Sequence, residues 1–209
     1  MRYETILEPA TAELTEKRSV FTGNIVHVQS EGQAEEYIKT VKSKYWDAKH
    51  HVFAYVLREG QIRRYSDDAE PQGTAGLPIL DVLIKQGLQD VCLVVVRYFG
   101  GVLLGAGGLT RAYRSAAAQT VAAAQRVEMI LGKKMYIECD YAAYQAVENL
   151  VFAFEGQIDN TKFLEKIETV ILIPSERTEE FCRDLSDKTG GKIKITPRGE
   201  DFLSKKLTI

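Results

Sequence analysis

The stretch VCLVVVRYFGGVLLGAGGLTRAYRSAAAQTVAAA, residues Val91–Ala124, decides the fold of the chain around it. It begins with Val91–Val96, a short apolar run rich in β-branched residues, which predicts a strand buried on both faces. It ends with the alanine-rich segment Thr110–Ala124, which predicts a helix. Glycines are concentrated between the two segments, where we expect a loop whose backbone approaches another group closely.

The glycines and the arginines beside them predict a seat for an anion. The first N–H groups of a helix carry a partial positive charge and have no partner within the helix, so they attract negative groups. Arginines at the strand end and in the first turns of the helix add full positive charges. The residues that we expect to contact an anion or a nucleic acid are Arg97, Gly100, Gly101, Gly105, Gly107, Gly108 and Arg111.

Two well-defined phosphate-binding motifs do not fit this segment. Gly100 and Gly105 have the spacing of a Walker P-loop, but Ala106 and Gly107 follow where Lys and Ser or Thr are required. Gly105 and Gly107 also begin a dinucleotide fingerprint, but Thr110 replaces its last glycine. A second interpretation therefore stays open, in which the glycines only permit close packing of the strand against the helix.

A loop just upstream is acidic, with carboxylates at Asp67, Asp68 and Glu70. Like charges repel, so we expect a cationic group beside them, either arginines or a magnesium or calcium ion. The spacing is not that of an EF-hand. Pairing with Arg97 and Arg111 requires no additional ion, so we expect neither a resident metal nor a cofactor.

Two histidines at the start of the expected strand 51–58 provide an enzymatic alternative. His50 and His51 alternate between the two faces of a strand, and we expect one of them to lie near the acidic loop as a base or a ligand. In this alternative, the protein acts on a phosphorylated small molecule or a nucleotide with a divalent metal. Its catalytic residues would be His50, Asp67, Asp68 and Glu70.

Aromatic residues alternate with arginines around the glycine segment, at Tyr98, Phe99 and Tyr113 beside Arg97 and Arg114. This mixture is suited to stacking bases and binding phosphates, and it is also common at protein interfaces. We expect Phe99 and Tyr113 to lie in the core.

Hydrophobic periodicity predicts the remaining elements, with no element assigned to the polar segment 8–18. The expected strands are 3–6, 19–29, 51–58, 61–65, 133–139, 156–163, 168–173 and 192–196, and the expected helices are 33–45, 77–87, 141–154 and 176–188. Ser30 and Ser175 are expected to cap two of the helices. The β-α-β-β-α-β order of the last part is that of a ferredoxin-like fold. We therefore expect an α+β protein with domains at residues 1–132 and 133–209.

Composition limits the class of protein. A formal net charge of −2 over 209 residues predicts no bulk attraction to nucleic acid, so phosphate binding would require a local patch. The three cysteines are far apart in sequence, which indicates free thiols in a reducing compartment. The polar N-terminus and the absence of a long apolar run predict a cytoplasmic protein with no membrane partner.

Four blocks of this sequence resemble the IMPACT/YigZ family. They are KRSVF at 17–21, AKHHVFAY at 48–55, RYSDDAEPQGTAGLPILDVL at 64–83 and VVVRYFGGVLLGAGGLTRAY at 94–113. The resemblance covers most of residues 1–125, and the rest of the chain is similar to the small C-terminal domain of the bacterial members.

The resemblance implies both a fold and a role. The N-terminal domain should be similar to the second domain of a small-subunit ribosomal protein and to domain IV of elongation factor G, and the C-terminal part to the fifth domain of that factor. Eukaryotic relatives regulate translation by binding the activator of an initiation-factor kinase, a mechanism that we do not expect here. The preferred hypothesis is a non-enzymatic, translation-associated protein that binds RNA or a ribosome-associated partner. A further alternative makes the whole region a scaffold in which the acidic loop neutralises the arginines.

Overall fold

The computed structural model describes residues 1–206 of the chain, which form two compact units. The N-terminal unit contains Tyr3–Val127, and the C-terminal unit contains Glu128–Lys205 together with Met1–Arg2. Each combines helices with strands, so the chain is an α+β protein, as the sequence predicts. Within residues 1–206, no helix is both long enough and apolar enough to cross a bilayer.

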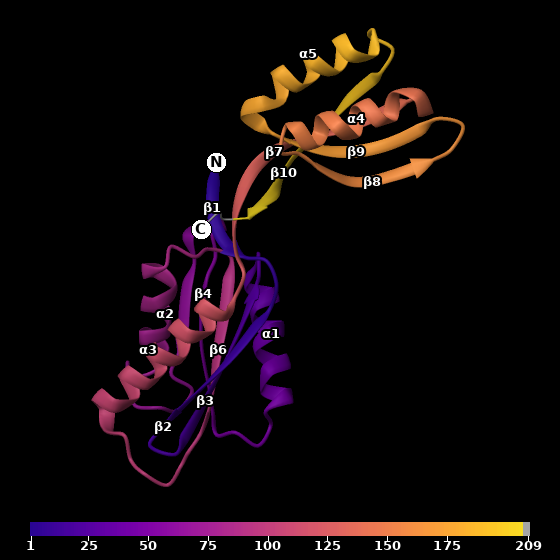
Figure 1. Ribbon diagram of the computed structural model, residues 1–209. Helices are drawn as coiled ribbons and strands as arrows, with labels where there is room; N and C mark the ends of the chain where they lie inside the picture. Colours follow the sequence, from indigo (N-terminus) through magenta and orange to yellow (C-terminus); the bar gives the residue numbers. More distant parts are fainter. Residues whose placement is uncertain (207–209) are drawn as a thin grey trace. The chain divides into compact units, whose positions relative to one another are not determined.

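A five-stranded antiparallel sheet is the middle layer of the N-terminal unit, with strand order β2-β3-β6-β4-β5 (Figure 1). The strands are β2 Ala10–Glu16, β3 Ser19–His27, β4 His50–Val56, β5 Arg63–Ser66 and β6 Val91–Tyr98, and a short 3-10 turn, Glu59–Gln61, joins β4 to β5. Helix α1 (Glu31–Lys44) covers one face of the sheet, and helices α2 (Gly76–Lys85) and α3 (Gly105–Ala123) cover the other.

Helices on both faces explain why β6 is apolar from Val91 to Val96. Leu93 and Val95 pack into the core beneath α2 and α3, whereas Val94 and Val96 pack into the core beneath α1. All of these side chains are fully buried. The continuous apolar run therefore reflects a central strand without a solvent face.

The sequence predicts most elements of this unit, but it misses one strand and misplaces the start of one helix. Strand β2 lies in the segment that we expected to be irregular, because only small residues and Leu14 mark its inward face. Helix α3 begins at Gly105, five residues before the expected start at Thr110. The expected start was too late because glycine normally disfavours a helix. Ser30 caps α1 as expected, since its hydroxyl accepts a hydrogen bond from the amide of Gln33 at 3.3 Å.

The C-terminal unit has the predicted ferredoxin-like β-α-β-β-α-β order. Its elements are β7 Arg126–Cys139, α4 Tyr141–Ala153, β8 Gln157–Phe163, β9 Ile167–Pro174, α5 Thr178–Thr189 and β10 Lys194–Lys206. The strands are ordered β10-β7-β9-β8, and β1 (Arg2–Ile6) also pairs with β7. Residues of α4 such as Leu150 and of α5 such as Phe181 pack on Ile137 and Ile171 of the sheet.

Two details of this unit differ from the expectation. Ser175 does not cap α5, because it lies in a separate 3-10 turn, Ser175–Arg177, and its buried hydroxyl has no hydrogen-bond partner among the described residues. Strand β10 extends to Lys206, well beyond the expected end at 196. The charged residues that follow residue 196 hide a strand from a search for apolar alternation.

We predict that Gly23→Ala destabilises the protein by about 1–3 kcal/mol, the usual cost of overpacking a core. A Cβ atom at this position in β3 would lie 1.9 Å from Oγ1 of Thr120 in α3. Thr120→Ala in the same chain should recover part of the loss, as urea unfolding followed by circular dichroism would measure. Gly32→Ala is the control, because its nearest neighbour is 4.0 Å away. Strictly additive effects of the two substitutions would contradict the predicted clash.

Candidate functional site

A buried ion pair lies beneath the end of β6. Arg97 donates from Nη1 to Oε1 of Glu70 at 2.7 Å, and the hydroxyl of Tyr113 donates to the same oxygen at 2.8 Å. The side chains of Arg97 and Glu70 are only 7% and 4% exposed. Burial, together with the charge of Glu70, raises the pKa of Tyr113, so its phenol remains a hydrogen-bond donor. The strand, the acidic loop and α3 therefore meet at one carboxylate oxygen.

The guanidinium of Arg97 also lies between two aromatic rings. Its centre is 5.6 Å from the ring of Phe21 and 5.6 Å from the ring of Phe99. Its Nε is buried and has no hydrogen-bond partner among residues 1–206. Arg97 is thus held by one carboxylate and two rings, and most of its charge is neutralised inside the protein.

Asp67 organises the acidic loop through backbone amides. Its carboxylate accepts hydrogen bonds from the amides of Gly73 at 2.8 Å, Ala75 at 3.1 Å and Gly76 at 2.8 Å. Gly76 is the first residue of α2, so this carboxylate lies at the positive end of that helix. Both oxygens of Asp67 are therefore engaged by the protein itself.

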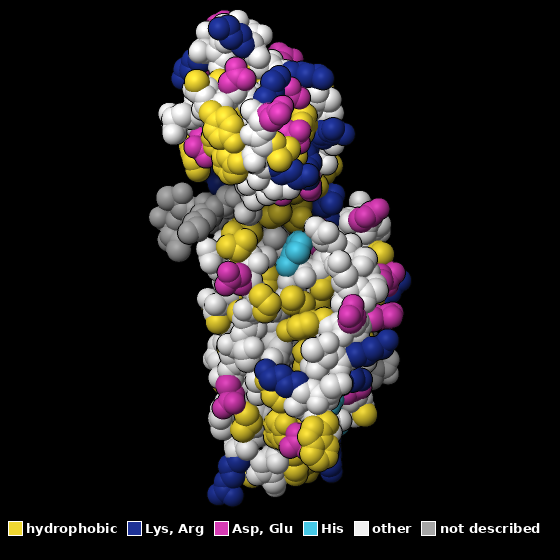
Figure 2. Space-filling model, turned by 90° about the vertical axis from the view of Figure 1, so that its right-hand side faces the viewer, with side chains coloured by type: hydrophobic (Ala, Val, Ile, Leu, Met, Phe, Trp, Pro, Cys, Tyr) yellow, Lys and Arg dark blue, Asp and Glu magenta, His cyan; other side chains and the backbone are white. Residues whose placement is uncertain are grey.

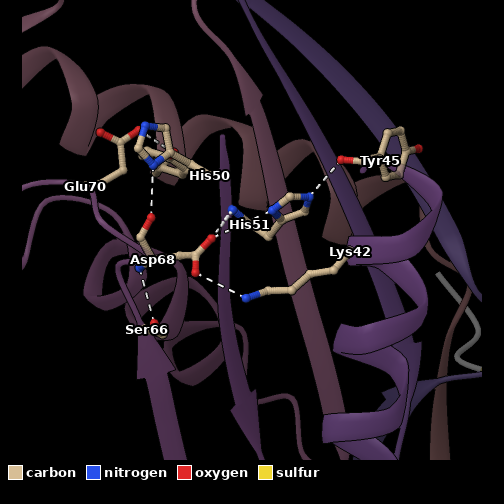
Figure 3. A network of polar contacts seen from close by, with 8 residues as sticks. Lys42, Tyr45, His50, His51, Ser66, Asp68 and Glu70 are labelled. Carbon is tan, nitrogen blue, oxygen red and sulfur yellow. Dashed lines mark hydrogen bonds and ion pairs between the residues drawn. The ribbon is translucent and has the colours of Figure 1, made fainter. Parts of the chain in front are cut away.

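Asp68 joins the acidic loop to β4 and α1 (Figure 3). Its carboxylate accepts from the amide of His51 at 2.7 Å and from Nζ of Lys42 at 3.2 Å. Its carbonyl is 2.9 Å from Nδ1 of His50, and because a carbonyl only accepts, that nitrogen carries the proton. The hydrogen bond therefore fixes the orientation of the His50 ring against the acidic loop.

The two histidines lie on opposite faces of the sheet, as strand alternation predicts. His51 donates from Nε2 to the carbonyl of Tyr45 at 2.9 Å, on the face that α1 covers. His50 is the register partner of Arg97 and lies on the Glu70 side (Figure 3). Among residues 1–206, no three His, Cys, Asp or Glu side chains converge on a point that would hold a metal ion.

The structure divides the expected glycine loop between a loop and a helix. Gly100 and Gly101 lie in the loop 99–104, whereas Gly105, Gly107 and Gly108 belong to the first turns of α3. Gly100 is required by packing, because a Cβ atom there would lie 2.0 Å from the backbone of Arg18. The loop is thus pressed against the turn between β2 and β3.

Gly107 has no such packing requirement. The atom nearest to a Cβ at this position is Nη1 of Arg111, at 3.6 Å, which is ordinary contact. Glycine in a helix costs up to about 1 kcal/mol relative to alanine. The fold therefore does not explain this glycine, whereas a ligand that approaches the backbone would.

Arg111 is exposed on the second turn of α3. It lines a groove of about 290 Å³ between α3 and β2, together with Lys17, Gly108, Ser115 and the carboxylate of Glu16. Within residues 1–206 it forms no ion pair. Arg97 and Arg111 therefore differ in kind, since one is buried and paired and the other is exposed and unpaired.

We call the loops that meet here the β6-end surface: the β2–β3 turn 17–18, the α1–β4 loop 45–49, the loop 99–104 and the first turns of α3. Lys17 and Arg18 form the β2–β3 turn and are exposed. Their place in a turn could not be predicted without β2, although a Lys-Arg pair directly before a strand is a usable signal for an exposed basic turn. It also missed Tyr113 as the second donor to Glu70.

The sequence blocks that build this surface are the blocks that resemble IMPACT proteins, and the family comparison agrees. The Impact N-terminal domain matches residues 17–121, and a domain of unknown function (DUF1949) matches residues 137–192. Together these matches define a two-domain protein. The chain belongs to the IMPACT family.

Relatives match over nearly the whole chain. IMPACT family member YvyE of Bacillus subtilis (strain 168) is 34% identical over 204 residues, covering 97% of this chain and 94% of that protein. IMPACT family member YigZ of Escherichia coli (strain K12) is 30% identical over 190 residues, covering 90% and 93%. A crystal structure described as that of a hypothetical protein is similar at a TM-score of 0.62 with 29% identity, covering 93% and 96%.

We predict that Glu70→Gln lowers the free energy of unfolding by about 3–5 kcal/mol, because it leaves the charge of Arg97 buried without a counter-ion. Asp81→Asn is the matched control, since its 3.7 Å pair with Arg114 is partly exposed and contributes less than about 1 kcal/mol. Urea titrations of both variants would measure the difference. Equal, small losses would contradict the prediction, because they would show that leaving the buried charge of Arg97 without its counter-ion costs little.

Proposed function

We propose that this protein is a translation-linked regulatory protein that binds RNA through the β6-end surface. Membership of the IMPACT family supports a regulatory role, and the resemblance implies such a role in translation for the eukaryotic relatives. The observation that carries the RNA assignment is an imbalance of free charge at this surface.

The carboxylates of the acidic loop are directed into the protein. Asp67 is bonded to loop amides, Asp68 to His51 and Lys42, and Glu70 to Arg97. The exposed cations of the surface have no carboxylate partner within residues 1–206; they are Lys17, Arg18, Lys49 and Arg111. These four free cations outnumber the two exposed carboxylates of the surface, Glu16 and Asp47, and such an excess of positive charge fits a phosphate backbone.

This charge distribution gives the two arginines of the site suggested by the sequence different roles. Arg97 supports the surface from beneath through Glu70 and Phe99, while Arg111 faces solvent. Gly107 leaves the start of α3 uncovered, so a phosphate oxygen can approach the first amides of the helix. The contacts to RNA would therefore come from Arg111, the β2–β3 turn and these amides.

Arg111→Ala is expected to weaken the binding of a labelled RNA in fluorescence anisotropy and to reduce its salt dependence. Removing one phosphate contact should lower the slope of log K against log salt by about 1. Arg183→Ala, which removes an exposed arginine from α5 of the C-terminal unit, is the charge-matched control. If both variants bind RNA as the native chain does, Arg111 does not contact phosphate.

Gly107→Ala is expected to raise the stability of the protein and to lower its affinity for RNA. The free energy of unfolding should rise by up to about 1 kcal/mol, because alanine favours the helix and its Cβ atom meets no clash. RNA affinity should fall, since the added methyl group covers the amides at the start of α3. Thermal unfolding and anisotropy on the same sample test both effects, and unchanged RNA affinity in a stabilised variant would argue against backbone contacts.

A further inference from the structure

The β6-end surface carries large hydrophobic side chains that the core does not cover. Trp46 is 82% exposed, Leu103 is 84% exposed and Phe99 is 54% exposed. Phe99 was expected in the core, and this expectation is wrong because the chain leaves β6 at Tyr98. In the space-filling view, hydrophobic side chains gather at the lower end of this unit, with an acidic side chain among them and basic side chains at the edge (Figure 2).

The sheet register brings the loops of Trp46 and Phe99 to the same end of the unit. Strand β4 begins at His50, which pairs with Arg97 near the end of β6, so the loops before β4 and after β6 are neighbours. The hydroxyl of Tyr98 donates to the carboxylate of Asp47 at 2.7 Å, which ties the two loops together. This bond raises the pKa of Tyr98 to about 12, so the tether persists through physiological pH.

The ring of Phe99 is supported from within. The guanidinium of Arg97 lies 5.6 Å from its centre, and Arg97 is fixed by Glu70. A ring that is held on one side and exposed for about half of its area (54%) is a preformed platform for stacking. Lys49 is exposed in the same loop as Trp46, and Arg18 is exposed in the β2–β3 turn, whose backbone lies against Gly100.

Unpaired cations around exposed aromatic rings match one kind of partner more closely than others. A purely apolar partner would leave the cations Arg18 and Lys49 desolvated without a counter-charge, at a cost. A nucleotide chain supplies phosphates for the cations and flat bases for the rings. A duplex hides the faces of its bases, whereas unpaired bases are free to stack on side chains.

We propose that the β6-end surface selects single-stranded RNA, with unpaired bases stacking on Trp46 and Phe99 and the backbone following the cations of the adjoining loops. This inference rests on the proposed function, and it adds which form of RNA is bound and which side chains select it.

The test uses the full chain, a 12-nucleotide RNA of mixed sequence, and the duplex of that RNA with its complement. Trp46 is the single tryptophan of the chain, so its fluorescence reports directly on the site. We expect the single strand to bind more tightly than the duplex and to quench this fluorescence. Trp46→Ala and Phe99→Ala should each weaken single-strand binding by about 5- to 100-fold and leave duplex binding nearly unchanged. Trp46→Phe should restore most of the loss.

Phe152→Ala is the matched control, because Phe152 is a comparably exposed aromatic residue (72%) on α4 of the C-terminal unit. Equal affinity for the two RNAs, with no quenching and no effect of Trp46→Ala, would overturn this inference and leave RNA binding intact. Binding of neither RNA would overturn both this inference and the proposed function. Circular dichroism of each variant confirms that a loss of binding is not a loss of fold.

Discussion

The buried ion pair between Arg97 and Glu70 is the interaction on which this end of the N-terminal unit depends. Transferring two charges from water costs several kcal/mol per ion, and their mutual attraction repays this only when the geometry is good and further hydrogen bonds form. Tyr113 supplies one such bond to the shared oxygen. The net gain in stability is therefore small, and the main effect of the pair is positional. It fixes β6, the acidic loop and α3 at one point.

The same pair determines the charge that the surface presents. A sequence with three carboxylates in four residues suggests an acidic surface, but Glu70 is turned inward to Arg97 and Asp67 is turned to the amides at the start of α2. Removing these carboxylates from the surface leaves Arg111 and the β2–β3 turn as its dominant charges. The electrostatic character of the surface thus follows from the packing beneath it, which a count of charged residues does not reveal.

The sequence predicts an element correctly where the residues that determine the element are close together in the chain. The strand at Val91–Val96 and the Ser30 cap were predictable, because apolar content and capping chemistry act within a few residues. The start of α3 at Gly105 was not, since tertiary packing overrides the low helix propensity of glycine. The sequence suggested that the acidic loop pairs with both Arg97 and Arg111, whereas the structure pairs Glu70 with buried Arg97 and leaves Arg111 exposed, because tertiary packing decides which arginine faces the loop.

Typical energies indicate how much phosphate contacts and base stacking would each contribute to RNA binding at this surface. The whole chain has a formal charge of −2, so long-range attraction to RNA is absent, and a few unpaired cations give only weak, salt-sensitive contacts. Stacking one base on an aromatic ring contributes about 1–3 kcal/mol and is screened little by salt. Two exposed rings therefore outweigh the cations at physiological ionic strength. Because Arg97 holds one of these rings, Phe99, the buried pair would shape the proposed RNA-binding surface without touching the RNA.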